Sequence, residues 1–285
     1  MIGGLAVVVI GAAVVGLLLA VFTEEEGALA LVLSEVTGEV TVIDPARVAG
    51  AAAPGRHLEP RDRLRTGERS RAVLEMGSET RIRLGPASAI EVRAVDEEGV
   101  EVELEGGAVQ ATVRPDSGSV RLSSRGREAL LTNAEVRMGV DPEGLLQLEA
   151  LRGDVMLGGI RGASLLEEDG RLFVADGGHA ELGEIPRELL LAVQWPDGAR
   201  TGAEAVEVSG RTEPGATVRV TGVGGVHEVR ADASGAFLAE VTLHEGDNPV
   251  RVEAIDLLGN RVEVQEVVER TSRGPTFRGG VEYGR

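Results

Sequence analysis

Apolar and polar residues alternate with a period of two along most of the chain after Leu31. The alternation is clearest in residues 35–44, 70–95, 99–113 and 117–124, and Gly, Pro or Asp separates the apolar runs. Such a pattern is typical of strands with one buried and one exposed face, joined by short turns. No stretch of this region keeps a helical period for three turns. The pattern therefore predicts an all-β protein.

The N-terminus breaks this pattern. Residues 2–22 are uncharged and almost wholly apolar, and three glutamates follow at positions 24–26. A helix rises about 1.5 Å per residue, so this segment would span roughly 31 Å, close to the thickness of the hydrocarbon layer. We predict a transmembrane anchor in residues 1–22, followed by a linker in residues 23–30. A cleaved signal peptide is the main alternative, although the segment lacks a basic start and a clear cleavage site.

Small residues at a spacing of four lie on one face of this predicted helix. They are Ala12, Gly16 and Ala20. Small residues at that spacing allow transmembrane helices to approach closely, which makes a homodimer through this face a weak hypothesis. Because the helix begins at the second residue, we expect every folded part to follow it and to lie outside the cytoplasm.

Residues 184–270 keep the strand alternation with different turns. We predict that Gly210 breaks a strand, that residues 213–215 form a turn, and that residues 233–235 form a hairpin turn. Residues 258–260 are predicted to turn into the last strand. Residues 271–285 have no period and are predicted to be a disordered tail.

The order of turns and strands in the first region resembles the FecR domain of bacterial envelope proteins. The resemblance is carried by "GEVTV" (38–42), "HLEPRDRLRTGERSRAVLEM" (57–76), "GSETRIRLGPASAIEV" (77–92), "LEGGAVQATV" (104–113) and "ALLTNAEVRMGVDPEGLLQLEALRGDVML" (129–157). Residues 133–135 depart from the family pattern. The resemblance implies a FecR-like β domain over residues 31–183. In the best-known members a cytoplasmic domain regulates a sigma factor, and because that part is absent here we expect no direct contact with a sigma factor.

The second region resembles the bacterial Ig-like, glucodextranase-B-like modules of envelope and carbohydrate-active proteins. The segments "SGRTEPGATVRV" and "ADASGAFLAEVTLHEGDNPVRVEAIDLLGN" carry this resemblance. It implies a seven-stranded antiparallel β-sandwich over residues 184–270. For Trp195, at the start of this region, we favour a packing role over ligand stacking.

Composition narrows the classes of partner. The net charge is −18 and aromatic residues make up only 2% of the chain. An acidic surface repels phosphate backbones, and base or sugar stacking needs exposed aromatic rings, so nucleic acid is excluded as a partner.

The core must be built from Val, Leu, Ala and Ile. There is no Cys, which removes disulfides and thiolate sites, and every basic residue is Arg.

No motif with catalytic or cofactor chemistry is present. The four histidines, His57, His179, His227 and His244, are scattered without a metal-ligand spacing. The segments 141–144 and 232–235 superficially resemble calcium loops, but they lack the alternating oxygen ligands of such loops. We therefore predict no catalytic, cofactor-binding or metal-binding residues, and no enzyme.

These expectations combine into a non-enzymatic protein-interaction or scaffold module of the cell envelope. It would cross the inner membrane once and place its folded part in the periplasm or outside the cell. A polysaccharide- or peptidoglycan-binding module is one alternative, and the aromatic poverty counts against it. A signal-sensing component that works through a separate membrane partner is the other.

Overall fold

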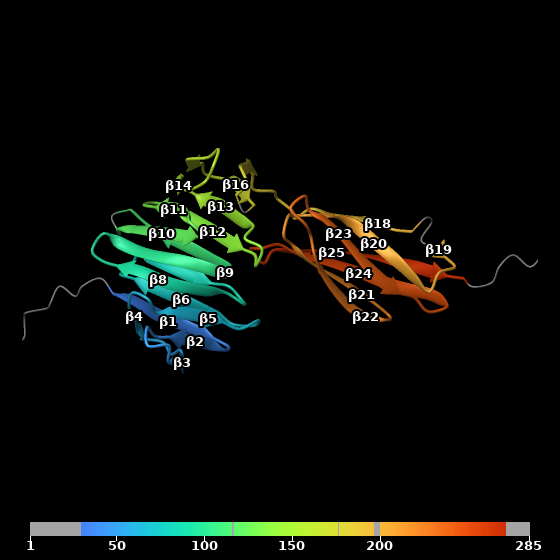
Figure 1. Cartoon of the computed structure of the whole chain (residues 1–285), viewed down its shortest axis with the longest axis horizontal. Coiled ribbons are helices and arrows are strands. Elements are labelled where there is room, and N and C mark those ends of the chain that lie inside the picture. The colour runs from blue at the N-terminus through green and yellow to red at the C-terminus, as the bar shows by residue number, and fades with distance from the viewer. Residues whose placement is uncertain (1–29, 116, 176, 197–199, 272–285) are drawn as a thin grey trace, which may run out of the picture.

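The computed structural model describes residues 30–115, 117–175, 177–196 and 200–271. Every regular element in these residues is a β-strand, which confirms the all-β class (Figure 1). None of the described segments forms a helix of the length and apolarity that a membrane crossing requires. The predicted anchor, its Ala12, Gly16 and Ala20, most of the linker and residues 272–285 of the predicted tail lie outside the described residues.

The first β unit runs from Leu31 to Glu184, one residue past the predicted end of the first region, and its described residues form two sheets. Sheet 1 has the order β4 (His57–Leu58), β1 (Leu31–Thr37), β6 (Arg71–Met76), β7 (Thr80–Leu84), β9 (Gly99–Val113), β12 (Glu135–Val140), β13 (Leu146–Arg152), β16 (Gly170–Val174), β17 (Ala180–Glu184). Sheet 2 has the order β3 (Ala49–Ala51), β2 (Val40–Ile43), β5 (Arg63–Thr66), β8 (Ala89–Val95), β9, β10 (Ser119–Ser124), β11 (Arg127–Leu131), β14 (Val155–Gly158), β15 (Leu165–Leu166). Among the pairings of the described strands of this unit, β9–β10 alone is parallel.

Strand β9 belongs to both sheets, because it changes partners in its middle. Residues 99–106 pair with β8 and β10, and residues 107–113 pair with β7 and β12. Gly107 lies at the change, with φ +83°, and a Cβ there would lie 2.6 Å from Ser88 Cα. Only glycine adopts this conformation without strain and leaves room for the backbone of the neighbouring turn.

One apolar core lies between the two sheets. It is built from Leu, Val, Ile, Ala and Met side chains and contains no aromatic ring among the described residues. The period-two alternation produces this arrangement, as in β7, where Thr80, Ile82 and Leu84 are buried and Arg81 is exposed. The predicted aliphatic core is therefore confirmed here. Burial of each large aliphatic side chain contributes about 1.5–3 kcal/mol.

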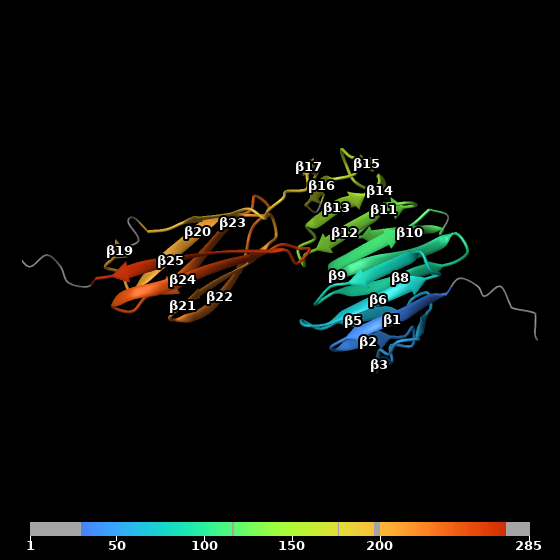
Figure 2. The same ribbon diagram turned by 180° about the vertical axis from the view of Figure 1, so that it is seen from behind.

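The second β unit runs from Leu191 to Arg270 and also has two sheets (Figure 2). Sheet 3 has the order β18 (Leu191–Gln194), β20 (Ala205–Thr212), β23 (Ala236–Thr242). Sheet 4 has the order β19 (Arg200–Thr201), β25 (Arg261–Arg270), β24 (Gly246–Ile255), β21 (Thr217–Gly222), β22 (Gly225–Arg230). The described strands number eight, not the expected seven, and the short β19 pairs parallel to β25.

Residues from both sheets contribute to the core of the second unit. Val208 comes from sheet 3, and Val218 and Val252 come from sheet 4. Trp195 is partly buried against this core, in agreement with its expected packing role.

Two local predictions for the second unit are wrong. The turn at residues 232–235 is not a hairpin, because β22 pairs with β21 and β23 pairs with β20, so the turn passes from sheet 4 to sheet 3. Gly210 does not break a strand but lies inside β20. A Cβ at Gly210 would meet the Ala192 carbonyl oxygen and lie 2.6 Å from the Phe237 ring, so this glycine makes room for a neighbouring strand and a core aromatic.

Candidate functional site

The residues considered as metal ligands do not come together in the structure. His57, His179, His227 and His244 are all exposed, on separate elements. Within the described ranges, no three His, Asp or Glu side chains form a group that could hold a metal ion.

The two calcium-like segments use their carboxylates to hold turns. Asp232 Oδ1 accepts hydrogen bonds from Ser234 Oγ at 2.7 Å, from Ser234 N at 2.8 Å and from Ala236 N at 3.0 Å. The Ser234 hydroxyl, followed by these two amides, lowers the pKa of Asp232 because hydrogen bonds to a carboxylate favour its charged form. Asp141 Oδ1 accepts from Leu145 N at 2.8 Å inside the β12–β13 hairpin.

Charged side chains from both β units meet at the junction of the two units. Arg171 of β16 places Nη1 3.0 Å from Glu213 Oε2 of the second unit, and both side chains are largely buried. Arg137 of β12 donates from Nη1 to Asn260 Oδ1 at 3.1 Å. In the other direction, Arg230 of β22 lies 3.8 Å from the carboxylates of Asp141 and Glu143. The junction is therefore cross-linked by arginines from both units.

Glycines allow the backbones at this junction to approach closely. A Cβ on Gly139 of β12 would lie 2.7 Å from the Leu257 carbonyl oxygen in the β24–β25 turn. A Cβ on Gly215, which has φ +71°, would lie 2.7 Å from Leu145 Cδ2 of the first unit. The β12–β13 hairpin thus fits against the β20–β21 and β24–β25 turns of the second unit at positions where a glycine leaves room.

Glu149 is the most deeply buried acid of the junction. Its side chain is only 2% exposed, and it lies directly opposite Arg137 in the β12–β13 ladder, with 2.7 Å between Oε2 and Nη2. Gln147 Nε2 donates to its Oε1 at 3.2 Å. Arg137 Nη2 approaches Glu149 Oε2 without hydrogen-bond geometry. Among the described residues, Glu149 Oε2 has no hydrogen-bond partner, and neither has Arg137 Nε.

Burial raises the pKa of Glu149, and the nearby Asp256 carboxylate raises it further. Arg137, the Gln147 amide and Arg171 act in the opposite direction and do not cancel this effect. Asp256 comes from the second unit, where its Oδ1 accepts from Asn260 N at 2.8 Å and its Oδ2 accepts from Asn260 Nδ2 at 2.8 Å. Two carboxylates from different units are therefore held near each other in a place with little water.

A cavity of about 440 Å³ lies beside this pair. Its wall consists of Arg137, Glu149, Ile185, Pro186, Arg187, Glu188, Leu189, Asp256, Asn260, Arg261 and Val262. The wall carries three arginines and three acids and no aromatic ring, so it offers paired charges and no stacking platform for a sugar.

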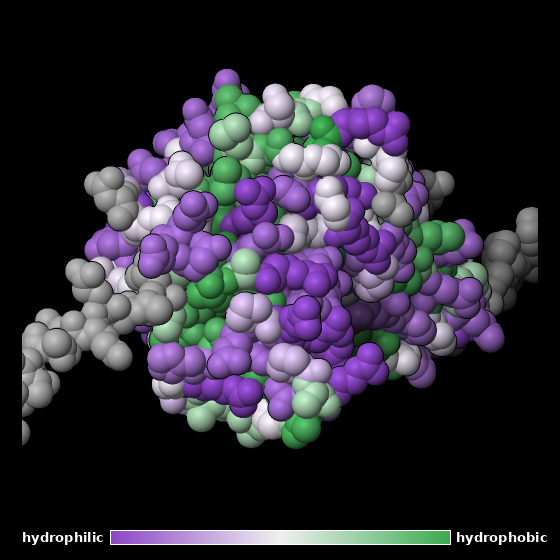
Figure 3. Space-filling view, turned by 60° about the vertical axis from the view of Figure 1, so that its left-hand side comes forward, coloured by the Kyte–Doolittle hydropathy of each residue, from purple (hydrophilic) through white to green (hydrophobic). Residues whose placement is uncertain are grey.

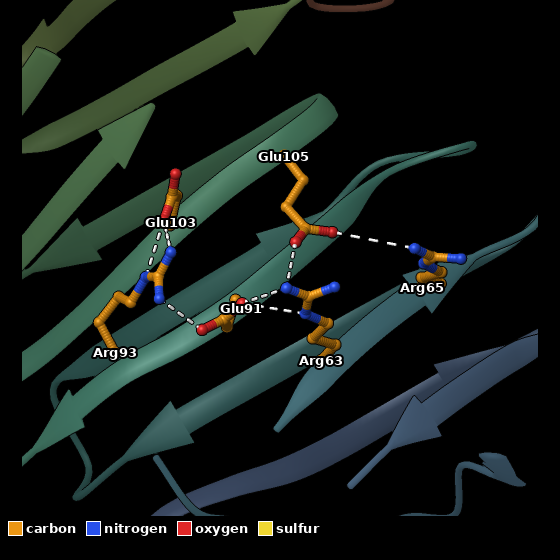
Figure 4. A network of polar contacts seen from close by, with 6 residues as sticks. All are labelled: Arg63, Arg65, Glu91, Arg93, Glu103 and Glu105. Carbon is orange, nitrogen blue, oxygen red and sulfur yellow. Dashed lines mark hydrogen bonds and ion pairs between the residues drawn. The ribbon is translucent and has the colours of Figure 1, made fainter. Parts of the chain in front are cut away.

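A second charged network covers the outer face of sheet 2 (Figure 4). Glu91, whose side chain is 7% exposed, bridges Arg63 at 2.8 Å and Arg93 at 2.6 Å. Arg93 also pairs with Glu103, and Glu105 lies 3.4 Å from Arg63. Hydrogen bonds to Glu91 and Glu103 raise the pKa values of Arg63 and Arg93, respectively. These charges satisfy one another within one unit, so the network stabilises the sheet surface.

The sequence did not identify Glu149 as a site residue. Gln147 and Glu149 alternate with Leu146 and Leu148, which predicts an ordinary solvent-facing strand surface. Both side chains are nonetheless buried, and Glu149 shares the wall of the junction cavity with the connecting segment and the second unit. The sequence shows polar residues alternating with apolar ones in segments 135–140 and 146–152, on either side of a turn. This pattern does not indicate what covers the polar face.

Comparison with known proteins identifies part of the first unit. Residues 62–156 match the sequence model of the FecR protein family, so this part of the chain is a FecR domain. The match begins before β5 and ends in β14, inside the region where the sequence resembled that family. It leaves the second unit unassigned. No curated protein matches the chain.

Several solved structures are similar to the chain at low identity. Two crystal structures of a candidate anti-sigma factor from Parabacteroides distasonis match with 13% and 12% identity and TM-scores of 0.40 and 0.39. Each covers 48% of this chain, and 69% and 70% of the matched chains, respectively. A bacterial ice-binding adhesin matches with 11% identity and a TM-score of 0.22 over 83% of this chain and 86% of its own. Neither likeness bears on the function of this chain.

Proposed function

We propose that the chain is a non-enzymatic protein-interaction module of the bacterial cell envelope, held at the inner membrane by residues 2–22. In this proposal the FecR-like domain covers residues 31–183, and residues 184–270 form an Ig-like module of the bacterial type. The FecR domain at residues 62–156 and the strand-only architecture of the described residues support this assignment.

The observation that carries the proposal is an open sheet edge with exposed apolar side chains. Strand β15 ends sheet 2 and pairs only with β14 among the described residues. Met156 and Leu165 face each other across these two strands and are 63% and 45% exposed, and Leu130 is the next partner of Met156 in the row. Unpaired edges and exposed apolar rows are features that protein partners use.

The remaining surface offers little to other ligand classes. Hydrophilic residues cover most of the face drawn in Figure 3, and apolar residues form separate patches between them. The 2% aromatic content and the net charge of −18 disfavour sugar and nucleic-acid ligands. A protein partner that pairs with a sheet edge fits this chemistry best.

Site-directed photocrosslinking in living cells tests the proposal. The chain has no Lys, so amine-reactive reagents cannot label its side chains, and a photoreactive residue must be introduced instead. Such a residue at Leu165 is expected to capture one or a few defined envelope proteins, whereas one at the exposed Ser78, in the β6–β7 turn, is expected to capture none. Equal capture at both positions, or none above background at Leu165, would contradict the proposal.

The membrane topology is tested separately. The chain has no Cys, so Glu97→Cys in the exposed β8–β9 turn provides a single thiol. In spheroplasts this thiol is expected to react with a membrane-impermeant maleimide. Labelling only after lysis would place the folded part in the cytoplasm.

The FecR domain also favours a second candidate function, signal sensing through a separate membrane partner. Deletion would then change transcription before any envelope defect develops, whereas loss of a scaffold would cause envelope defects first. Cosedimentation with purified sacculi tests the polysaccharide alternative, and binding there would replace the protein-partner assignment.

A further inference from the structure

We propose that docking of the two β units is coupled to proton uptake at the junction, so that the relative placement of the units responds to the pH outside the cytoplasm. The inference rests on the proposed function for its setting, because the envelope exterior is where pH varies. Its physical basis is independent of that setting and lies in the arrangement of charges around Glu149.

The group that would take up the proton belongs to the first unit. Glu149 lies on the outer face of sheet 1, and its nearest cation, Arg137, is its cross-strand neighbour in that same unit. The ion pair between them can therefore persist whether or not the second unit is docked. It does not by itself make docking depend on pH.

The second unit adds the groups that change with docking. The charged groups that face Glu149 from the surrounding elements are Arg137 of β12, Arg171 of β16, Arg187 and Glu188 of the connecting segment, Asp256 of the β24–β25 turn and Arg261 of β25. Asp256 repels the charged form of Glu149, and burial of Glu149 beside the connecting segment and the second unit adds to that effect. Both effects favour the protonated form, and the repulsion by Asp256 needs the docked arrangement.

The sign of the coupling follows from linkage. Docking brings in Asp256, which raises the pKa of Glu149, so the docked form should bind the proton more tightly than a form without that carboxylate nearby. Docking should therefore strengthen as the pH falls from neutral toward the ordinary range of a glutamate, and weaken as the pH rises above the raised value. Each pKa unit of difference corresponds to a tenfold change in the docking equilibrium constant.

Stronger acid should reverse the trend. The cross-links from Arg171 to Glu213 and from Arg230 to Asp141 and Glu143 need charged carboxylates. Once these acids are protonated, the arginines lose their partners. The structure thus predicts tightest docking at mildly acidic pH, with looser docking on both sides.

Pulsed electron double resonance on the full chain in lipid nanodiscs tests the proposal. Glu97→Cys and Val226→Cys place one spin label on each unit of a chain that has no other thiol. Both positions are exposed. The docked fraction is expected to be larger at about pH 5.5 than at about pH 8, and the gain in the docking constant should approach tenfold per unit of pKa difference as the pH falls below the pKa of the undocked form.

Two variants assign the effect to the junction. Glu149→Gln removes the titrating group, so its docked fraction is expected to exceed that of the parent at about pH 8 and to change little between the two pH values. Asp256→Asn keeps the oxygen that accepts the turn amides and removes the repelling charge, so it should reduce the pH response. Glu91→Gln is the matched control, since it neutralises a carboxylate of similar burial in the sheet 2 network.

The outcomes separate this inference from the proposed function. An equal docked fraction at both pH values in the parent, or a full pH response in Glu149→Gln, would refute proton coupling, whatever partners the crosslinking recovers. If Glu149→Gln does not fold, Asp256→Asn decides the question from the other unit. A pH response with no captured envelope partner would leave the coupling intact and refute the interaction role.

Discussion

At the scale of single residues, the junction shows how position decides what a charged pair contributes. Arg137 and Glu149 are cross-strand neighbours, and Glu149 has no other cation as close, with 2.7 Å between their charged atoms. A buried pair of this kind contributes little net stability compared with an apolar pair, yet loss of one member leaves the other charge buried without a partner. Removal of Arg137 alone should therefore lower the stability more than removal of both members of the pair.

We expect Arg137→Leu to lower the free energy of unfolding of the first unit by roughly 3–5 kcal/mol at neutral pH. The loss should be smaller at mildly acidic pH than at neutral pH, because burial raises the pKa of Glu149 and its carboxylate carries no uncompensated charge once it is protonated. Urea unfolding at the two pH values measures both effects. Arg83→Leu on strand β7 of the same sheet is the control, for which we expect a change within about 0.5 kcal/mol.

At the scale of elements, the strands could be predicted more fully than their partners. Alternation over residues 70–95 predicts strands with one buried face, and Ile82 and Leu84 lie on such a face, because that pattern is a property of the strand itself. The turn at 232–235 was predicted as a hairpin, because turn residues look the same whether the next strand stays in the sheet or crosses to another. The roles of Gly107 and Gly210 depend on Ser88 and Phe237, which are distant in sequence, so no local pattern could reveal them.

The bend of β9 gives the sharpest test at this scale. Gly107→Ala would force a side chain into φ +83° and against Ser88 Cα, so we expect a loss of roughly 2–4 kcal/mol in the free energy of unfolding. Gly106→Ala is the matched control, because a Cβ at the adjacent position meets nothing within 4 Å. Chemical denaturation followed by far-UV circular dichroism compares the two. Equal losses would show that the bend does not require glycine.

At the scale of the whole molecule, the two units are joined by charged cross-links and by the close approach of Gly139 and Gly215 to leucines, and not by an extension of either core. The two apolar cores are separate sets of residues, and the cross-links between units are Arg171–Glu213, Arg137–Asn260 and Arg230 with Asp141. The sequence indicated two β regions but not this contact, since each of its members lies on a strand or turn that looks solvent-facing by itself. The placement of the units should therefore depend on charge, while each unit keeps its own fold.

Charge reversal at the most buried cross-link tests that dependence. The Arg171 side chain is 18% exposed and that of Glu213 is 7% exposed. We expect Arg171→Glu to broaden the distance distribution between labels at Glu97→Cys and Val226→Cys, because it sets two like charges against each other at a largely buried contact. Adding Glu213→Arg restores an opposite pair and should recover much of the parent distribution. Arg63→Glu, which disrupts the sheet 2 network inside one unit, should leave the distribution unchanged. If the double variant has a distance distribution as broad as that of Arg171→Glu alone, the geometry of this pair, and not its charge, holds the units together. If Arg171→Glu has the distribution of the parent, the pair does not hold the units together.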